Sequence, residues 1–269
     1  MRDWCTNPTI VLIAVLVFVI PLRNPSTARN WRRCEQLCKQ TIASAPGQTN
    51  PNVRVILACR EFEPGMENPR LIVVRKPFPD PKQDWVDQHR DKSEKICAAL
   101  VEARKHSPCY VMKLDGDDLV SNRLAAYVHE QANPNGYYIP KGYLWRDDGR
   151  TLMPLNNFHV ACGSSNIVYA NSEELPSSAG VDFSQLPLLR FGHHVTVESY
   201  ASMGRPLQAI PFRAAIYRQA SGENISGFLQ PPEASRYKKP NWKFYVGLLL
   251  EQRKRHLLTA GLKREFFGL

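Results

Sequence analysis

Short apolar runs alternate with amphipathic segments along the first half of the chain, and this alternation constrains the fold more than any other feature. Val53–Cys59, Arg70–Val74 and Cys109–Leu114 have the length and composition of buried strands. Two other segments, Asn30–Ile42 before the first of these runs and Asp91–Lys105 before the last, carry apolar residues at helical spacing. Strands that alternate with helices form a mostly parallel sheet covered on both faces, and such sheets bind ligands outside the carboxyl ends of their strands. The sequence therefore predicts an α/β fold.

The apolar run from Ile10 to Leu22 is predicted to be the first strand of this sheet. It is rich in Val and Ile, and Pro21 ends it, as is typical of a central strand buried on both faces of a parallel sheet. A bilayer span needs about 20 apolar residues, more than this run provides. Asp3 and the lack of a small-residue cleavage site argue against a signal peptide. A membrane anchor stays as the alternative interpretation.

The second half of the chain has weaker periodicity. Ser121–Gln131 and Val195–Met203 are predicted to be helices, the second one ending at Gly204. Three segments are predicted to be extended: Gly136–Trp145 as a strand or hairpin, His159–Tyr169 as a strand broken by Gly163, and Leu207–Tyr217 as the final strand.

The net charge of +10 favours an anionic partner, either a nucleoside diphosphate or a phospholipid surface. No zinc-finger, recognition-helix or RNA-binding signature accompanies the charge, so nucleic acid is not expected as a partner. The seven cysteines are odd in number and lack the spacing of a zinc site or disulfide framework. This usage indicates a reducing compartment, and we expect the protein to be cytoplasmic, with peripheral membrane contact as one option.

The strongest local motif is an acidic cluster that follows the strand Cys109–Leu114. Asp115, Asp117 and Asp118 place three carboxylates within four residues. So much negative charge is unfavourable unless a cation lies nearby, and Mg²⁺ and Mn²⁺ prefer oxygen ligands. The alternative is an acidic turn that caps a helix starting near Ser121. The position of the cluster at the end of a buried strand, where an α/β sheet binds ligands, favours a metal site.

Three segments resemble glycosyltransferases of the GT-A fold, family 2-like. They are VFVIPLRN (17–24), YVMKLDGDD (110–118) and GHHVTVESYASMG followed by AAIYRQASGENIS (192–226). The resemblance implies a Rossmann-like GT-A domain over residues 1–230, with a donor-binding half at about 10–120 and an acceptor half at about 121–230. Residues 231–269 would form a basic, amphipathic and helical C-terminal tail.

The resemblance also implies a nucleotide-sugar donor site and a bound Mn²⁺ or Mg²⁺. The metal ligands would be Asp115, Asp117 and Asp118. The donor would contact Pro21, Arg23, Asp91, Lys92, Lys95 and Asp115, although Lys95 equally suits a solvated helix face. A polar stretch that could bind sugar hydroxyls, or form a β-turn, comprises Asn156, Asn157, Gly163, Ser164 and Ser165.

Two positions depart from the family pattern. Where the family has Glu-Asp, with the Asp often the catalytic base, this chain has His193-His194. A neutral imidazole can accept the proton of an acceptor hydroxyl, and we favour His194 over His193. Asp182 and Glu198 are fallback bases, and a capping or exposed position is the alternative for each histidine. Where the pattern often has a His after Tyr-Arg, this chain has Gln219-Ala220.

These features predict metal-dependent transfer of a sugar from a nucleotide to an acceptor hydroxyl, with inversion. Three alternatives stay open: a nucleotidyl or phosphoryl transferase, a catalytically impaired protein that binds nucleotide-sugar or glycan, and a haloacid-dehalogenase-like phosphatase. The phosphatase is disfavoured because no Asp follows the first strand. The acceptor would be a glycan or lipid-linked molecule. Arg253-Lys254-Arg255, in the amphipathic segment from Trp242 to Leu258, suggests docking on an anionic membrane, unless this segment only closes the core.

Overall fold

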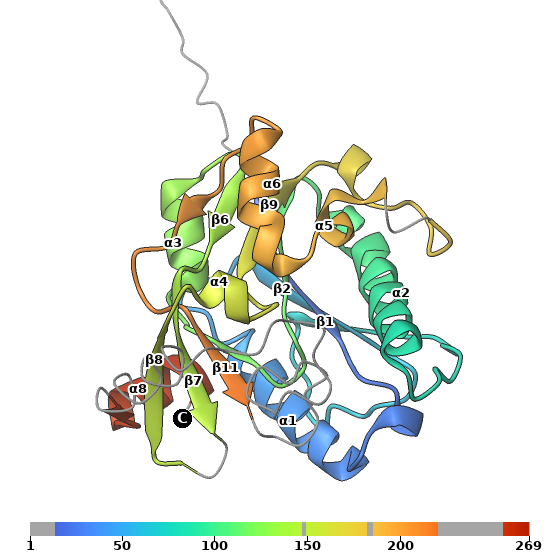
Figure 1. The fold of residues 1–269 in the computed structure, drawn as a ribbon, viewed down its shortest axis with the longest axis horizontal. Helices are drawn as coiled ribbons and strands as arrows, with labels where there is room; N and C mark the ends of the chain where they lie inside the picture. Colours follow the sequence, from blue (N-terminus) through green and yellow to red (C-terminus); the bar gives the residue numbers. More distant parts are fainter. Residues whose placement is uncertain (1–13, 147–148, 182–184, 220–254, 269) are drawn as a thin grey trace, which may run out of the picture.

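The computed structural model of the chain describes residues 14–146, 149–181, 185–219 and 255–268, and it contains two β-sheets (Figure 1). The larger sheet has seven strands in the order β10 (Gln208–Ala209), β6 (Gly136–Tyr138), β9 (Asn166–Ala170), β4 (Cys109–Lys113), β1 (Val15–Pro21), β2 (Val53–Cys59) and β3 (Leu71–Arg75). The α/β class predicted from the sequence is confirmed.

The strands β3, β2, β1 and β4 are adjacent in that order and all parallel. This is the first half of a doubly wound, Rossmann-like sheet. β9 then pairs antiparallel with β4, and β6 pairs antiparallel with β9. The central sheet is therefore mostly parallel, and its parallel strands β3, β2, β1 and β4 are those whose carboxyl ends are expected to bind a ligand.

Two long helices cover opposite faces of this sheet. α1 (Trp31–Ser44) places Cys38 and Ile42 in one apolar cluster with alternate residues of β1, among them Phe18. α2 (Trp85–Ala103) places Ile96 and Leu100 in a second cluster with the intervening residues of β1. Side chains of a strand alternate between its two faces, so a strand that contacts both helices is apolar throughout.

The smaller sheet has five strands in the order β12 (His256–Leu257), β8 (Thr151–Asn156), β7 (Lys141–Arg146), β11 (Ala215–Gln219) and β5 (Leu119–Val120). The helix α8 (Ala260–Phe267) packs its buried Phe266 in a cluster with Leu119 and Ile216 of this sheet. Glu265 accepts a hydrogen bond from Ser121 Oγ at 2.6 Å. The described end of the tail thus belongs to the core of the second sheet.

Several predicted boundaries shift in the structure. The helix expected from Asp91 starts at Trp85, where the side chain of Asp84 accepts a hydrogen bond from the backbone N of Asp87. The helix expected from Ser121 is α3 (Leu124–Gln131), and the one expected from Val195 is α6 (Thr196–Ser202). Short helical turns complete the fold: η1 (Pro25–Thr27), η2 (Arg104–His106), η3 (Ser172–Glu174), α5 (Pro187–Arg190) and η5 (His193–Val195).

Three predictions in the second half were wrong. The strand predicted over His159–Tyr169 consists of a helical turn, α4 (Phe158–Ala161), a loop and then β9. Gly136–Trp145 is divided between β6 and β7, which belong to different sheets, and Leu207–Tyr217 is likewise divided between β10 and β11. The strand β8 was not predicted, because Pro154 and the polar residues before it argue against a strand.

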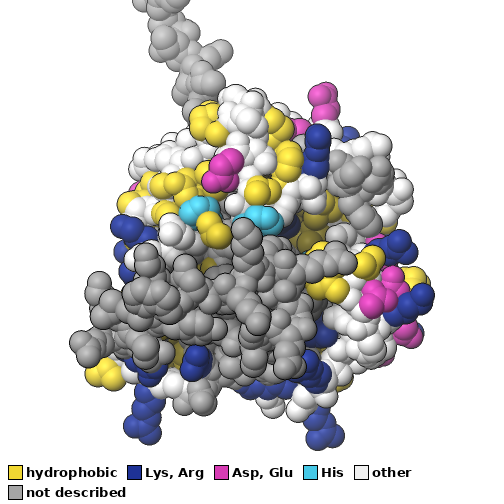
Figure 2. All heavy atoms as spheres, in the orientation of Figure 1, with side chains coloured by type: hydrophobic (Ala, Val, Ile, Leu, Met, Phe, Trp, Pro, Cys, Tyr) yellow, Lys and Arg dark blue, Asp and Glu magenta, His cyan; other side chains and the backbone are white. Residues whose placement is uncertain are grey.

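Within the described residues, no helix has both the length and the apolar character to cross a bilayer. The apolar run from Ile10 contributes β1, as predicted, over Val15–Pro21. Asp182 and most of the predicted amphipathic segment from Trp242 lie outside the described residues. On the face shown in Figure 2, described Lys and Arg side chains gather along the lower part of the molecule, in keeping with the net charge of +10.

Candidate functional site

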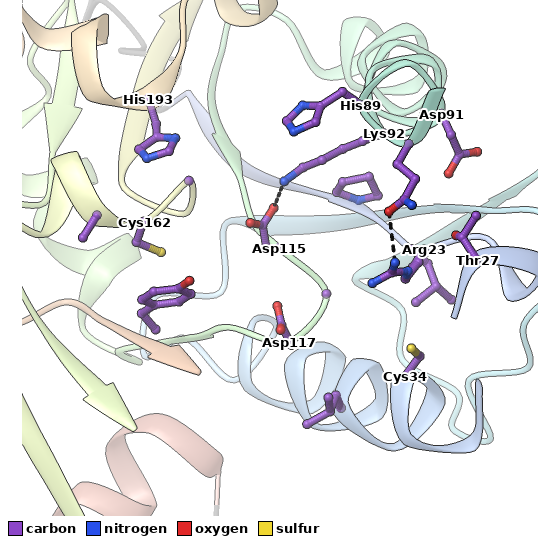
Figure 3. A pocket seen from close by; sticks show the side chains of 18 residues that line it. Arg23, Thr27, Cys34, His89, Asp91, Lys92, Asp115, Asp117, Cys162 and His193 are labelled. Carbon is purple, nitrogen blue, oxygen red and sulfur yellow. Dashed lines mark hydrogen bonds and ion pairs between the residues drawn. The ribbon is translucent and has the colours of Figure 1, made fainter. Parts of the chain in front are cut away.

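A pocket lies at the carboxyl ends of β1 and β4, the position predicted for a parallel sheet (Figure 3). The residues after β1 contribute Leu22 and Arg23, and the loop after β4 contributes Asp115, Gly116 and Asp117. The remaining wall comes from α1, α2, the segment around Gly163, and three further positions. These lining residues are Cys34, Leu37, Gln88, His89, Asp91, Lys92, Ala161, Cys162 and Gly163, with Thr27, His193 and Tyr217 as the three further positions.

Asp115 forms an ion pair with Lys92 in the middle of this pocket. The distance between Lys92 Nζ and Asp115 Oδ1 is 2.6 Å, and about a third of each side chain is exposed. Burial alone would raise the pKa of Asp115, but the positive charge of Lys92 and the hydrogen bond that it donates outweigh burial and hold the pKa below its usual value. Lys92 keeps its charge for the same reason, since the neighbouring carboxylates raise its pKa despite burial.

Asp117 lines the same pocket, close to the carboxylate of Asp115. Burial and the neighbouring Asp115 carboxylate raise the pKa of Asp117 to about 6. Its side chain extends into the pocket (Figure 3). A carboxylate whose charged form is disfavoured in this way gains stability when a cation approaches it.

Asp118 lies behind the pocket rather than in its wall. The residue is fully buried, and its carboxylate accepts three hydrogen bonds: from Ser164 Oγ at 2.6 Å, from Cys162 Sγ at 3.1 Å and from the backbone N of Arg218 at 3.1 Å. These partners come from the loop before β9 and from β11. Asp118 therefore connects the acidic loop to two other parts of the fold, and both of its carboxylate oxygens already accept hydrogen bonds within the protein.

The donor set fits a divalent cation that binds together with a ligand. Within the described part of the chain, no group of three or more His, Cys, Asp or Glu side chains could hold a metal ion. Mg²⁺, however, is usually held by one or two carboxylates plus substrate phosphates and water. Asp115 and Asp117 meet that requirement, whereas Asp118 would first have to lose its hydrogen bonds. The metal roles assigned to the three residues stay predictions.

The residues predicted to bind the donor separate into two groups. Pro21, Arg23, Asp91 and Lys92 line the pocket together with Asp115, and Arg23 donates a hydrogen bond to Gln88 Oε1 at 3.0 Å. Lys95 is fully buried outside the pocket wall, where its Nζ atom lies 2.6 Å from Asp91 Oδ2. Lys95 therefore acts on the pocket only through Asp91.

The structure brings His193, and not His194, to the pocket. The Nε2 atom of His193 lies 3.1 Å from the carbonyl oxygen of Val160. His194 is exposed beside Gly192, and Glu198 is exposed on α6. A carbonyl oxygen only accepts hydrogen bonds, so Nε2 of His193 carries the hydrogen and Nδ1 is the acceptor of the neutral ring. Burial, the largest influence, lowers the pKa of His193.

Sequence reasoning missed several lining residues. Gln88 and His89 were left out because the helix was predicted to start after them, and a capping signal at Asp84 could have extended it. Cys162 and Tyr217 gave no local signal. In the predicted polar stretch, Gly163 lines the pocket, and a Cβ atom there would come within 3.3 Å of Asp115 Oδ2.

No protein-family model and no curated protein matches this chain. Among solved structures, S. aureus TarS 1–349 resembles it with a TM-score of 0.42 and 11% identity, over 76% of this chain and 60% of that chain. A longer S. aureus TarS structure gives a TM-score of 0.32 and 12% identity, over 76% of this chain and 36% of that one. This chain therefore spans less than two thirds of either TarS chain.

A third similar structure is a proposed glucose-1-phosphate thymidylyltransferase from Bacillus anthracis, in complex with a sucrose. Its TM-score is 0.33 at 10% identity, over 75% of this chain and 87% of that chain. At these identities, the likeness to all three structures extends only to the arrangement of helices and strands.

Proposed function

We propose that this protein transfers a sugar from a nucleoside diphosphate donor to an acceptor hydroxyl. The observation that carries the proposal is the combination of Asp115, Asp117 and Lys92 in one pocket at the carboxyl edge of the sheet. Two carboxylates that can share a cation, next to a lysine that stays charged, are complementary to a diphosphate with a bound metal.

The labelled side chains of the pocket form three groups that follow one another across Figure 3. Arg23, Thr27 and Asp91 lie at one end, and His193 with Cys162 lies at the other. Asp115 and Lys92 are between them. We place the nucleoside at the first end, the diphosphate at the acidic loop, and the transferred sugar beside His193.

Asp115 and Asp117 would hold Mg²⁺ or Mn²⁺ together with the donor phosphates. When bound, the metal offsets the negative charge on the departing nucleoside diphosphate. Lys92 adds a second positive charge at the same place. Asp118 keeps the loop in position through its three internal hydrogen bonds.

His193 is the base that we propose for the acceptor hydroxyl. Its ring is held by the carbonyl oxygen of Val160, and burial favours the neutral form that can accept a proton. A base that activates the acceptor for a single displacement leads to inversion at the anomeric carbon. We propose a glycan or lipid-linked molecule as the acceptor.

Donor hydrolysis tests the function directly, because a transferase often releases nucleoside diphosphate slowly when no acceptor is present. We expect a nucleotide-sugar to raise the melting temperature only with Mn²⁺ or Mg²⁺, by mass action, and to be hydrolysed slowly. Thermal stabilisation without release would indicate a binding protein. Release of pyrophosphate from a nucleoside triphosphate and a sugar phosphate would indicate a nucleotidyltransferase.

A further inference from the structure

Trp85 is a large aromatic side chain that is exposed to solvent next to the pocket. It is the first residue of α2, and 64% of the residue is accessible to solvent. Its indole packs on the ring of His89, with the ring centroids 4.0 Å apart and an angle of 38° between the ring planes. His89 in turn lines the pocket. An aromatic surface therefore continues from the pocket wall to the outside of the molecule.

The start of α2 holds Trp85 in a defined place. Asp84 caps the helix, because its side chain accepts a hydrogen bond from the backbone N of Asp87 at 2.8 Å. The contact with His89 fixes the indole from the side of the pocket. A ligand that binds the exposed part of this indole therefore has little rearrangement to offset.

The surroundings of Trp85 suit a sugar ring better than a protein or a lipid surface. In the first turn of α2, all of which the structure describes, only Val86 adds a second exposed apolar side chain, and two such side chains offer less area than protein interfaces bury. The neighbours Asp84, Asp87 and Gln88 are polar. A pyranose ring has matching chemistry, with C–H groups on its faces that pack on an indole and hydroxyl groups at its edge that bind polar side chains.

Trp85 also lies where an acceptor could extend away from the proposed base. His193 and His89 both line the pocket, and in Figure 3 both rings lie above the ion pair of Asp115 and Lys92. An acceptor whose hydroxyl reaches His193 can therefore continue past His89 and place a more distant part on Trp85.

We propose that Trp85 binds a sugar ring of a glycan acceptor, at least one ring away from the ring that carries the reacting hydroxyl. The acceptor is then an oligosaccharide or a polysaccharide, and not a single sugar or an alcohol without sugar rings. This inference rests on the function proposed above, since it assumes that the reaction takes place beside His193.

An array of immobilised glycans, from monosaccharides to hexasaccharides, tests the proposal. The unmodified protein should bind a set of oligosaccharides but not their single sugars. Trp85→Ala should bind the same oligosaccharides roughly 10-fold more weakly, as for the loss of one aromatic contact, and Trp85→Phe should keep most of the affinity. If the unmodified protein binds no oligosaccharide, or if Trp85→Ala binds them equally well, the proposal is wrong.

Val86→Ser is the matched control, because Val86 is 62% exposed in the same turn but carries no aromatic ring. It should bind the array as the unmodified protein does. With a bound glycan used as the acceptor, Trp85→Ala should raise the KM for that glycan roughly 10-fold, again as for one aromatic contact, and leave kcat and the KM of the donor unchanged. A fall in kcat with an unchanged glycan KM would contradict the proposal.

Donor binding separates this inference from the proposed function. A nucleotide-sugar with Mn²⁺ should stabilise Trp85→Ala as much as the unmodified protein, because Trp85 does not line the pocket. If no nucleotide-sugar stabilises the unmodified protein, the proposed function fails, and the assignment of a bound glycan as the acceptor fails with it. If a nucleotide-sugar binds but the array shows no dependence on Trp85, only the present inference fails.

Discussion

Ser164 joins Asp118 to the backbone of Asp115: its Oγ atom donates to Asp118 Oδ2 at 2.6 Å and accepts from Asp115 N at 2.9 Å. Both Ser164 and Asp118 are fully buried. The hydroxyl thus fixes the first and the last residue of the acidic loop relative to each other. Ser164 therefore helps to position the Asp115 and Asp117 carboxylates in the pocket, although Ser164 itself does not line the pocket.

Ser164→Ala should therefore weaken nucleotide binding from behind the pocket. Loss of the hydroxyl leaves a buried carboxylate oxygen with one donor fewer, and we expect the free energy of unfolding to fall by about 1–3 kcal/mol. Affinity for a nucleoside diphosphate in Mn²⁺ should fall as well. Ser165→Ala is the control, since Ser165 is equally buried but does not bond to the loop. Equal affinities of both variants would contradict this role.

Asp117→Asn should abolish the metal-dependent part of donor binding. It removes the carboxylate that extends into the pocket, and because it also removes repulsion from Asp115, stability should be unchanged or higher. The measurement is thermal stabilisation by UDP-, GDP- and dTDP-sugars in Mn²⁺ and in EDTA. Glu130→Gln, an exposed position on α3, should behave as the unmodified protein. If nucleotide-sugars with Mn²⁺ stabilise Asp117→Asn as much as the unmodified protein, the acidic cluster is only a structural turn.

The same residue predicts a pH dependence. Burial and the charge of Asp115 raise the pKa of Asp117 to about 6. A proton and a metal ion compete for the carboxylate, so Mn²⁺-dependent nucleotide affinity should fall as the pH decreases through about 6. Binding in EDTA should not follow this curve. Nucleotide titrations between pH 5 and pH 8, with and without Mn²⁺, measure the difference.

Lys92→Gln should weaken diphosphate binding without abolishing the fold. Removal of one charged partner of a phosphate costs about 1.5–3 kcal/mol, which is a loss of roughly 10- to 100-fold in affinity. The dependence of affinity on salt should also become shallower. Lys105→Gln breaks an ion pair with Glu102 outside the pocket and should change neither quantity. If Lys92→Gln binds UDP as tightly as the unmodified protein, Lys92 does not bind the diphosphate and only forms the ion pair with Asp115.

The first half of the fold could be predicted because its signals are local. Val53–Cys59 matches β2 residue for residue, since a strand buried on both faces is a continuous apolar run between polar loops. The position of Asp115 at the end of β4 follows from the same pattern. Gly136–Trp145 could not be assigned correctly, because the sheet that each half joins depends on partners far along the chain.

The directions of the side chains in the site could not be predicted from the sequence either, because they also depend on partners far along the chain. Asp118 is buried by hydrogen bonds from Ser164 and from the backbone of Arg218, one hundred residues further on. His193 faces the pocket because it lies in a tight turn before α6, whereas a helix starting nearby gave no basis for choosing it over His194. The sequence predicted that the acidic residues and a histidine would lie near the ligand site, but not which of their side chains face the pocket.

The basic tail predicts binding to anionic membranes. Each Lys or Arg near such a surface contributes about 1 kcal/mol, so Arg253, Lys254 and Arg255 together could give reversible attachment. Apart from Arg255, these residues lie outside the described part of the chain. Co-sedimentation with anionic vesicles should recover the unmodified protein and lose the variant with all three changed to Gln. Equal recovery would end the membrane interpretation.

His193→Ala should lower turnover by about 100- to 10,000-fold, the usual contribution of a general base, with little change in donor affinity. His194→Ala is the matched control, since its exposed ring does not line the pocket. A metal ligand would behave differently, because its loss would weaken metal and nucleotide binding together. Donor affinity and turnover, measured on both variants, separate these roles.

The pH profile of turnover gives the second test of His193. Burial lowers the pKa of His193 from its ordinary value of 6.5 and outweighs the opposing effect of Asp115. The base works in its neutral form, so turnover should fall as the pH decreases through a pKa below 6.5. The profile must be recorded at saturating Mn²⁺ and donor, because protonation of Asp117 acts in the same range. An acidic limb that survives in His193→Ala would remove this histidine from the mechanism and return the role to Asp182 or Glu198.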